Sequence, residues 1–330
     1  MRNLFLTTAE AAALIGAGTP LFAAGSAKAL AALPKGAWIG GSTPYFMTEA
    51  GGLIDHDRVF CTVLDEAEES RTVIVAPDAL AGLTLQRYPN GFSYALIPAF
   101  SEVHQRFALE ANDIPDLYAQ PVIGWITGID LADLGKEKPV VVDGATGLAH
   151  ENAVAVMHVA LKPGYYAEPD IVNLFTPDES VSLTFPATGF SATTCLVNGV
   201  ETHLAALLRD NKIETSLPLV SSYAGAVVNV SFQAVHEDKV DFYAPVIAER
   251  TYHLAQQVGD YPAAYGVLCQ AQGPQSANDA VFSFNCILNY LYAALEGKTT
   301  GGFVGPVTFG EVAYILLNQT LVRLDVRPEG

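Results

Sequence analysis

The stretch that decides the fold class is TTAEAAALIGAGTPLFAAGSAKALAALPKGAWIGG, residues 7–41. It opens with a T-x-x-E pattern, in which the hydroxyl of Thr7 and the carboxylate of Glu10 close the start of a helix. Ser26 is placed to cap a second short helix in the same way. A short apolar strand follows each helix, and the second strand runs into a glycine turn at Gly40. This alternation of helices and strands predicts an α/β fold.

The rest of the chain continues in the same style, and we predict mixed sheets with helices on their faces. Residues 153–161 are almost continuously apolar, as expected for a strand that is covered on both faces. Near the end, a second T-x-x-E pattern at Thr308 predicts a helix over 308–317. A helix that leads to a strand and a glycine turn occurs at 29–41 and again at 204–225, which leaves open whether the chain consists of two duplicated halves.

Composition excludes several classes of protein. Half of the 330 residues are hydrophobic and 16% are charged, which is too apolar for a disordered chain. The formal net charge of −18 disfavours binding to nucleic acid or to anionic lipid surfaces. No apolar run reaches the roughly 18–20 residues that a membrane-spanning helix requires. Because the capping pattern at Thr7 suits a helix of the folded protein better than a signal peptide, we expect a cytoplasmic protein that keeps its first 33 residues.

Motifs for metals, cofactors and catalysis are weak. The seven histidines show no zinc-binding helical spacing, and the four cysteines are scattered without a C-x-x-C pair. We therefore expect no metal site, no cofactor, no structural disulfide and no assigned catalytic residue. Two nucleophiles stay open as alternatives. Ser42 follows a strand in a glycine-rich turn, and Cys286 begins a helix whose dipole would lower the pKa of its thiol.

Three stretches resemble the FIST (F-box and intracellular signal transduction) sensory domains of bacteria. The first is residues 38–44, WIGGSTP, where Gly41 replaces the usual Cys and Pro44 the usual Ala. The second runs from Leu217 to Gly225. The third is Phe284-Asn285-Cys286 with the later Gly302-Phe303, Gly310-Glu311 and Asn318-Gln319-Thr320. Residues 34–54 are also similar to a family of uncharacterised bacterial proteins.

The resemblance implies a fold and a function. It implies an N-terminal domain at 1–205 and a C-terminal domain at 206–330, either separate or packed as one unit. It also implies a stand-alone sensory protein in bacterial signal transduction, with a small-molecule ligand and a signalling protein as partners. Two alternatives remain: an enzyme, a hydrolase or transferase that uses Cys286 or Ser42 in the same pocket, and a haem-type gas sensor that uses one histidine.

The expected ligand site lies at the glycine-rich strand ends, because ligands of open α/β sheets bind where strands end and helix N-termini begin. Its candidate residues are Gly40, Gly41, Ser42, Thr43, Asn285 and Cys286. Accordingly, we expect Gly41→Val to impair binding more than folding. For Glu311, the capping pattern favours a role in helix capping over contact with a ligand.

Overall fold

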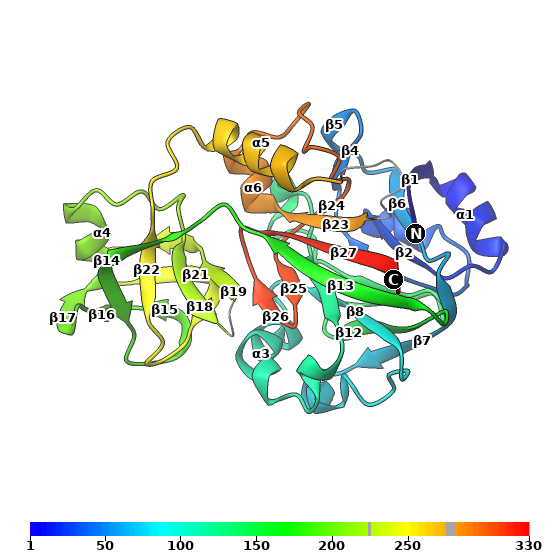
Figure 1. The fold of residues 1–330 in the computed structure, drawn as a ribbon, viewed down its shortest axis with the longest axis horizontal. Coiled ribbons are helices and arrows are strands. Elements are labelled where there is room, and N and C mark those ends of the chain that lie inside the picture. The colour runs from blue at the N-terminus through cyan, green and yellow to red at the C-terminus, as the bar shows by residue number, and fades with distance from the viewer. Residues whose placement is uncertain (224–225, 275–280, 330) are drawn as a thin grey trace.

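The computed structural model describes residues 1–223, 226–274 and 281–329. In Figure 1 the chain forms a large body and a smaller lobe at one end. Three six-stranded sheets make up the body, whereas the lobe holds one six-stranded and one three-stranded sheet. The predicted α/β class of mixed sheets with helices on their faces is confirmed. No helix in the described ranges is long and apolar enough to cross a membrane.

The body is built from three units that repeat one order of elements: strand, helix, strand, helix, strand, hairpin, strand. The first unit contains β1 (Arg2–Thr7), α1 (Thr8–Gly16), β2 (Leu21–Gly25), α2 (Ala27–Ala31), β3 (Trp38–Ser42), the hairpin β4 (Tyr45–Thr48) and β5 (Gly51–Ile54), and β6 (Arg58–Val63). The second contains β7 (Ala67–Val75), the 3-10 helix η1 (Pro77–Gly82), β8 (Gly91–Pro98), α3 (Glu102–Glu110), β9 (Val122–Thr127), the hairpin β10 (Val141–Asp143) and β11 (Leu148–His150), and β12 (Val154–Leu161). The third contains β13 (Tyr165–Val172), α5 (Tyr261–Gln272), β23 (Val281–Cys286), α6 (Ile287–Tyr292), β24 (Gly305–Thr308), the hairpin β25 (Glu311–Ala313) and β26 (Ile315–Leu317), and β27 (Leu321–Pro328).

Strand pairing repeats along with the order of elements. In the first unit β3 lies parallel to β2, β2 antiparallel to β6, and β6 antiparallel to β1. The same arrangement links β9, β8, β12 and β7 in the second unit. It links β24, β23, β27 and β13 in the third. The repeat in the pairing is therefore threefold and does not divide the chain into two halves.

Each unit gives its hairpin to the sheet of another unit. The hairpin β4–β5 of the first unit extends the third sheet at β24, and β10–β11 of the second unit extends the first sheet at β3. The hairpin β25–β26 of the third unit extends the second sheet at β9. The exchange closes a ring, so that every sheet of the body contains strands from two units.

Aromatic rings from the three units meet in the centre of the body. The ring of Phe22 on β2 stacks on that of Tyr94 on β8, with 3.8 Å between centroids. The ring of Phe282 on β23 lies 5.2 Å from Tyr94 and 5.7 Å from Phe22. One large buried cluster contains all three rings, so the units share a single core.

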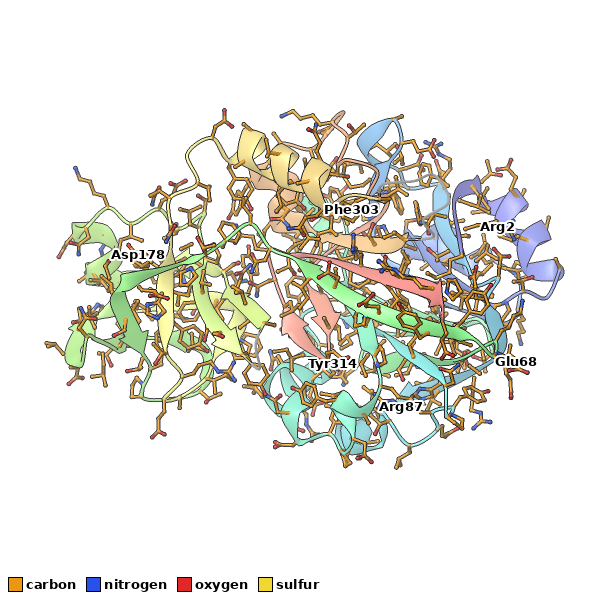
Figure 2. The ribbon with its side chains drawn as sticks, viewed as in Figure 1. Arg2, Glu68, Arg87, Asp178, Phe303 and Tyr314 are labelled. Atoms are coloured by element: carbon orange, nitrogen blue, oxygen red, sulfur yellow. The ribbon has the colours of Figure 1, made fainter. Side chains whose placement is uncertain are left out.

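The lobe, residues 177–255, is inserted in the third unit between β13 and α5. Its elements are β14 (Pro177–Thr184), β15 (Gly189–Ala192), β16 (Thr194–Val197), β17 (Val200–His203), α4 (Leu204–Asp210), β18 (Leu219–Tyr223), β19 (Ala226–Val230), β20 (Phe232–Val235), β21 (Val240–Val246) and β22 (Tyr252–Ala255). One hydrophobic cluster consists of lobe residues alone, among them Phe185 and Tyr252. In Figure 2 Asp178 lies in the lobe, apart from Phe303 and Tyr314 in the body.

Several predicted elements are present. Thr7 caps α1 with the expected capping box, and Ser26 caps α2. The apolar stretch at 153–161 forms β12, every residue of which is buried. These elements follow from local signals: a hydroxyl that bonds a backbone N–H three residues on, or an unbroken apolar run.

The boundary position 205/206 lies within α4, and strands from both sides of it share sheets. Two expectations differ from the structure. The predicted turn after Gly40 is strand, because β3 continues to Ser42 between β2 and β10. The predicted helix over 308–317 is the end of β24 followed by the hairpin β25–β26, which pairs with β9. Residues 224–225, the end of one FIST-like stretch, lie outside the described residues.

Candidate functional site

Hydrogen bonds link the carboxyl end of β3 to the carboxyl ends of β9 and β24. Ser42, Thr127 and Thr308 occupy the same register position, each opposite the last residue of the parallel strand beside it. The hydroxyl of Ser42 donates to the carbonyl oxygen of Gly128 at 2.8 Å. The hydroxyl of Thr43 donates to the carbonyl oxygen of Val307 at 2.7 Å. Residues 40–43 thus end β3, whereas residues 285–286 end β23, the counterpart of β2 in the third unit. The two predicted stretches lie close together, because Val307, which accepts the hydroxyl of Thr43, pairs with Asn285.

The four predicted residues of the first unit are packed into the body. A Cβ added to Gly40 would lie 2.8 Å from the ring of Trp38, and one added to Gly41 would lie 2.5 Å from the ring of Trp125. Ser42 also accepts the backbone N–H of Val140 at 2.9 Å. All four residues are buried, and their polar groups already bond the backbone of neighbouring strands. Their observed contacts are those of structural residues.

Asn285 and Cys286 belong to a buried polar network. The side-chain oxygen of Asn285 accepts hydrogen bonds from the hydroxyl of Tyr265 at 2.8 Å and from the amide of Asn289 at 3.0 Å. Cys286 is 1% exposed and lies beside Glu311. Burial raises the pKa of the Cys286 thiol well above its usual range, and the nearby carboxylate adds to the shift. The alternative in which the helix dipole lowers this pKa finds no support, because loss of hydration outweighs the effect of the short helix α6.

Glu311 is fully buried and caps no helix. Its carboxylate accepts hydrogen bonds from the hydroxyl of Thr308 at 3.1 Å and from the hydroxyl of Thr320 at 2.7 Å. Burial raises the pKa of Glu311 to about 8, although these donors oppose the shift. The Thr308–Glu311 contact expected from the capping pattern exists, but it joins the side chains of two consecutive strands that belong to different sheets.

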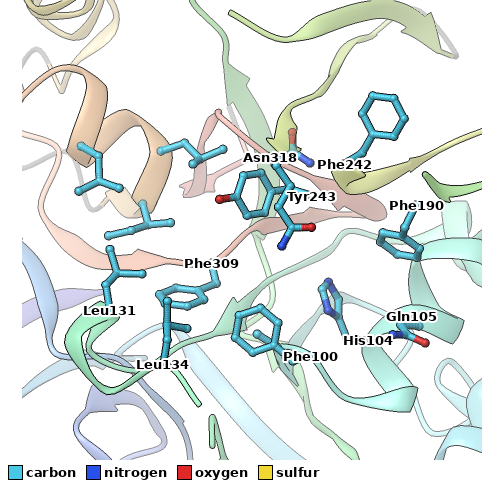
Figure 3. Close-up of a pocket in the computed structure, with 15 residues that line it drawn as sticks. Phe100, His104, Gln105, Leu131, Leu134, Phe190, Phe242, Tyr243, Phe309 and Asn318 are labelled. Carbon is cyan, nitrogen blue, oxygen red and sulfur yellow. The ribbon is translucent and has the colours of Figure 1, made fainter. Parts of the chain in front are cut away.

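A cavity of about 310 Å³ lies between the lobe and the body, and we call it the lobe cavity. Its body wall comes from α3 and the segment before it, from α6, from the loops that follow β9 and β24, and from the residue after β26. Its lobe wall comes from residues of β15, β20 and β21. Rings line much of it, as Figure 3 shows: Phe100, Phe190, Phe242, Tyr243 and Phe309. The aliphatic lining is Ala99, Leu131, Leu134, Ile287, Leu288 and Leu291.

The polar lining of the lobe cavity carries no formal charge in the part of the chain that the structure describes. It consists of Gln105, Gln233, Asn318 and His104. Burial lowers the pKa of His104 to about 4, so its imidazole is neutral at physiological pH. In Figure 3 Asn318 and His104 approach the cavity from opposite sides. Among the described atoms, neither the Nδ2 of Asn318 nor the Nε2 of His104 has a hydrogen-bond partner.

Two of the eight described non-glycine residues with positive φ lie near the same cavity. Phe100, in the segment before α3, has φ of +63°, and Gln319, next to Asn318, has φ of +56°. Residues other than glycine rarely adopt this left-handed backbone conformation, and those that do are often found at binding sites. Phe100 is also 56% exposed. The fold therefore holds a large aromatic side chain at the cavity in a conformation that costs free energy.

Sequence reasoning missed most of this cavity. It placed ligands at strand ends that run into helices, and residues 98–101 between β8 and α3 satisfy that rule. The two helix starts at Ser101 and Cys286 border the cavity, and the sequence predicts that Cys286 begins a helix. Asn318 was noted only as part of a motif. Nothing in the sequence indicated the wall from the lobe, because that contact depends on how the lobe packs against the body.

The fold and the cavity together define an α/β protein with a three-unit body and a lobe over an uncharged, aromatic cavity. The chain belongs to the family of unknown function DUF6976, whose match covers residues 6–327. This range takes in all three units and the lobe. No curated protein matches the chain.

Proposed function

We propose that this protein is a stand-alone small-molecule-binding sensory protein of the bacterial cytoplasm, with the lobe cavity as its ligand site. One observation carries the proposal: a cavity of about 310 Å³ is lined by Asn318, whose buried amide N–H has no partner among the described residues. Buried polar groups are nearly always satisfied, so an unpaired one on a cavity wall points to a ligand. The resemblance to FIST sensory domains points in the same direction.

Catalysis by Ser42 or Cys286 receives less support. The Ser42 hydroxyl is buried and bonded to Gly128 and Val140, and neither nucleophile lines the lobe cavity. A Cys thiol with a raised pKa is protonated at neutral pH and is a poor nucleophile.

A haem sensor would need an axial ligand, and His104 is the histidine of the lobe cavity. Its neutral imidazole suits iron, but the described lining offers no cationic side chain for the haem carboxylates. An absorption spectrum of the purified protein with a Soret band would revive this alternative.

The position of Asn318 suggests how occupancy reaches a signalling partner. Its side-chain oxygen accepts the backbone N–H of Ser231 at 3.0 Å and the Ser231 hydroxyl at 2.8 Å. Gln319, the next residue, donates to the carbonyl oxygen of Ser216 at 2.7 Å. A ligand on Asn318 would therefore strengthen or weaken the docking of the lobe, and a partner protein that contacts both lobe and body would sense the change.

Binding of the uncharged fluorophore N-phenylnaphthylamine tests the proposal. We expect its fluorescence to rise with the wild-type protein as it enters the lobe cavity. Leu291→Trp at the exposed cavity mouth and Ala99→Leu on the inner wall add bulk to the cavity, and each should weaken binding at least about tenfold. Ala132→Leu, the matched change at an exposed position, should leave affinity within about twofold. Equal binding by all four proteins would place the probe elsewhere and refute the proposed site.

A further inference from the structure

The orientation of the Asn318 amide is fixed by its partner. The backbone N–H of Ser231 can only donate, so the Asn318 atom that it meets at 3.0 Å must be the oxygen. The opposite atom, Nδ2, is therefore an N–H donor. Asn318 is 2% exposed, and no acceptor among the described residues bonds this donor. A ligand that satisfies it must supply an acceptor oxygen or nitrogen.

Charge restricts the ligand further. An ionised group moved from water into a cavity pays a large desolvation penalty unless an opposite charge or several donors receive it. The described lining of the lobe cavity provides no such charge, and the chain as a whole carries −18. Anionic ligands are disfavoured on both grounds, and cationic ligands find no carboxylate in the lining.

The shape of the lining favours a ring. Phe100 and Phe309 meet edge to face, with 6.0 Å between ring centroids and 77° between ring planes. Exposed apolar side chains, Phe100, Leu134 and Leu291, also border the cavity. Flat apolar molecules bury the most surface against such walls and gain from edge or stacked contacts with the rings.

We propose that the ligand of the lobe cavity is an uncharged, ring-containing molecule whose carbonyl oxygen accepts the N–H of Asn318. This inference rests on the proposed function, since it specifies the ligand of the same site. The carbonyl end points toward Asn318, and the ring lies among the aromatic side chains of the body and the lobe. Because the oxygen of the same amide accepts the hydrogen bonds of Ser231, Asn318 links the ligand to the lobe.

Three naphthalenes of nearly equal shape, substituted at the same ring position, test the ligand class on the wild-type protein. They are acetylnaphthalene with a carbonyl, isopropenylnaphthalene without one, and the naphthoate anion. Their dissociation constants are measured by displacement of N-phenylnaphthylamine. We expect the ketone to bind about tenfold tighter than the alkene, as one buried hydrogen bond provides, and the anion to bind weakest.

A pair of variants assigns the preference to Asn318. Asn318→Asp keeps the oxygen that Ser231 needs but loses the donor, so the ketone should bind no better than the alkene. Asn211→Asp makes the same amide-to-acid change at an exposed position of the lobe outside the cavity, so the preference for the ketone should persist.

The outcomes separate this inference from the proposed function. If the probe binds but the alkene equals the ketone, or the anion binds tightest, the inference is wrong while the binding site stands. A preference for the ketone that survives in Asn318→Asp also overturns it. If neither the probe nor any naphthalene binds, the proposed function fails and the inference fails with it.

Discussion

Gly41 lies at a position in β3 that has no room for a side chain. A Cβ there would lie 2.5 Å from the ring of Trp125 and 2.7 Å from the methyl group of Thr127. The Trp125 ring is held by its hydrogen bond to the hydroxyl of Tyr94 and by burial, so it has little freedom to move aside. The structure thus assigns Gly41 to close packing between the first and second units.

We predict that Gly41→Ala lowers the free energy of unfolding by about 1–3 kcal/mol, the usual cost of overpacking a core. Gly16→Ala is the matched control, since nothing lies within 4 Å of its Cβ position at the end of α1. It should be neutral or stabilising by up to about 1 kcal/mol. Urea unfolding of both variants measures the difference, and equal stabilities would show that the core yields at Gly41. A loss of stability in Gly41→Ala alone would replace the expectation that Gly41→Val acts mainly on binding by a role in folding.

Glu311 makes stability depend on pH. Burial raises its pKa from an ordinary 4.5 to about 8 in the folded protein. Between these values the folded state holds a proton that the unfolded state has lost, so stability falls as the pH rises from 4.5 to 8. The fall amounts to a few kcal/mol, at about 1.4 kcal/mol for each unit of pKa difference.

We predict that Glu311→Gln abolishes this loss of stability at high pH. A glutamine amide resembles the protonated acid, since its NH₂ can donate to Thr308 while its oxygen accepts from Thr320. Urea unfolding at pH 5 and pH 8.5 should therefore show that the free energy of unfolding of the variant, relative to that of the wild type, is higher at pH 8.5 than at pH 5. Glu137→Gln, the same change at an exposed site, should follow the wild type at both. Parallel behaviour of Glu311→Gln and the wild type would mean that Glu311 ionises without cost.

At the scale of elements, two T-x-x-E patterns show what local sequence can and cannot predict. At Thr7 the pattern forms a capping box and begins α1. At Thr308 the same pattern lies on β24 and β25, where Val312 pairs with Gly124 of β9. Pairing with a distant strand outweighs the local preference for a helix there, and no window of neighbouring residues contains that information.

The threefold repeat was hidden for a related reason. Ser42, Thr127 and Thr308 are equivalent in register, but their neighbours on the parallel strands are Gly25, Pro98 and Cys286. Pairing requires backbone groups and burial, which many side chains satisfy, so equivalent elements need not share a sequence. The same limit applies to the candidate site. The rule that ligands bind where strands end and helices begin predicts a position near the lobe cavity, but the walls of the cavity come from body and lobe segments that are far apart in the chain.

At the scale of the whole molecule, the ring of exchanged hairpins joins the units of the body. Removing any one unit would deprive another sheet of its outer hairpin and would break the shared ring cluster of Phe22, Tyr94 and Phe282. The lobe stands in a different relation to the body, because none of its strands pairs with a described strand of the three units. Figure 1 shows two connecting segments that cross between them. We therefore expect the three units of the body to unfold together, and the lobe to be removable without unfolding them.

We predict that the body folds without the lobe. The backbone N–H of Gln256 donates to the carbonyl oxygen of Thr176 at 2.9 Å, so two glycines can replace residues 177–255 without moving the ends of the body. The product should keep a single cooperative thermal transition, at a lower temperature because lobe residues such as Val228 and Ala244 pack into clusters of the body. It should also lose binding of N-phenylnaphthylamine, since Phe190, Phe242 and Tyr243 are removed with the lobe.

The control is deletion of the hairpin β4–β5, which removes far fewer residues but uncovers β24 and should destabilise the body more. The opposite result, in which the chain without the lobe is unfolded and the chain without the hairpin is folded, would contradict the prediction. It would show that the lobe, and not the exchange of hairpins, holds the three units together.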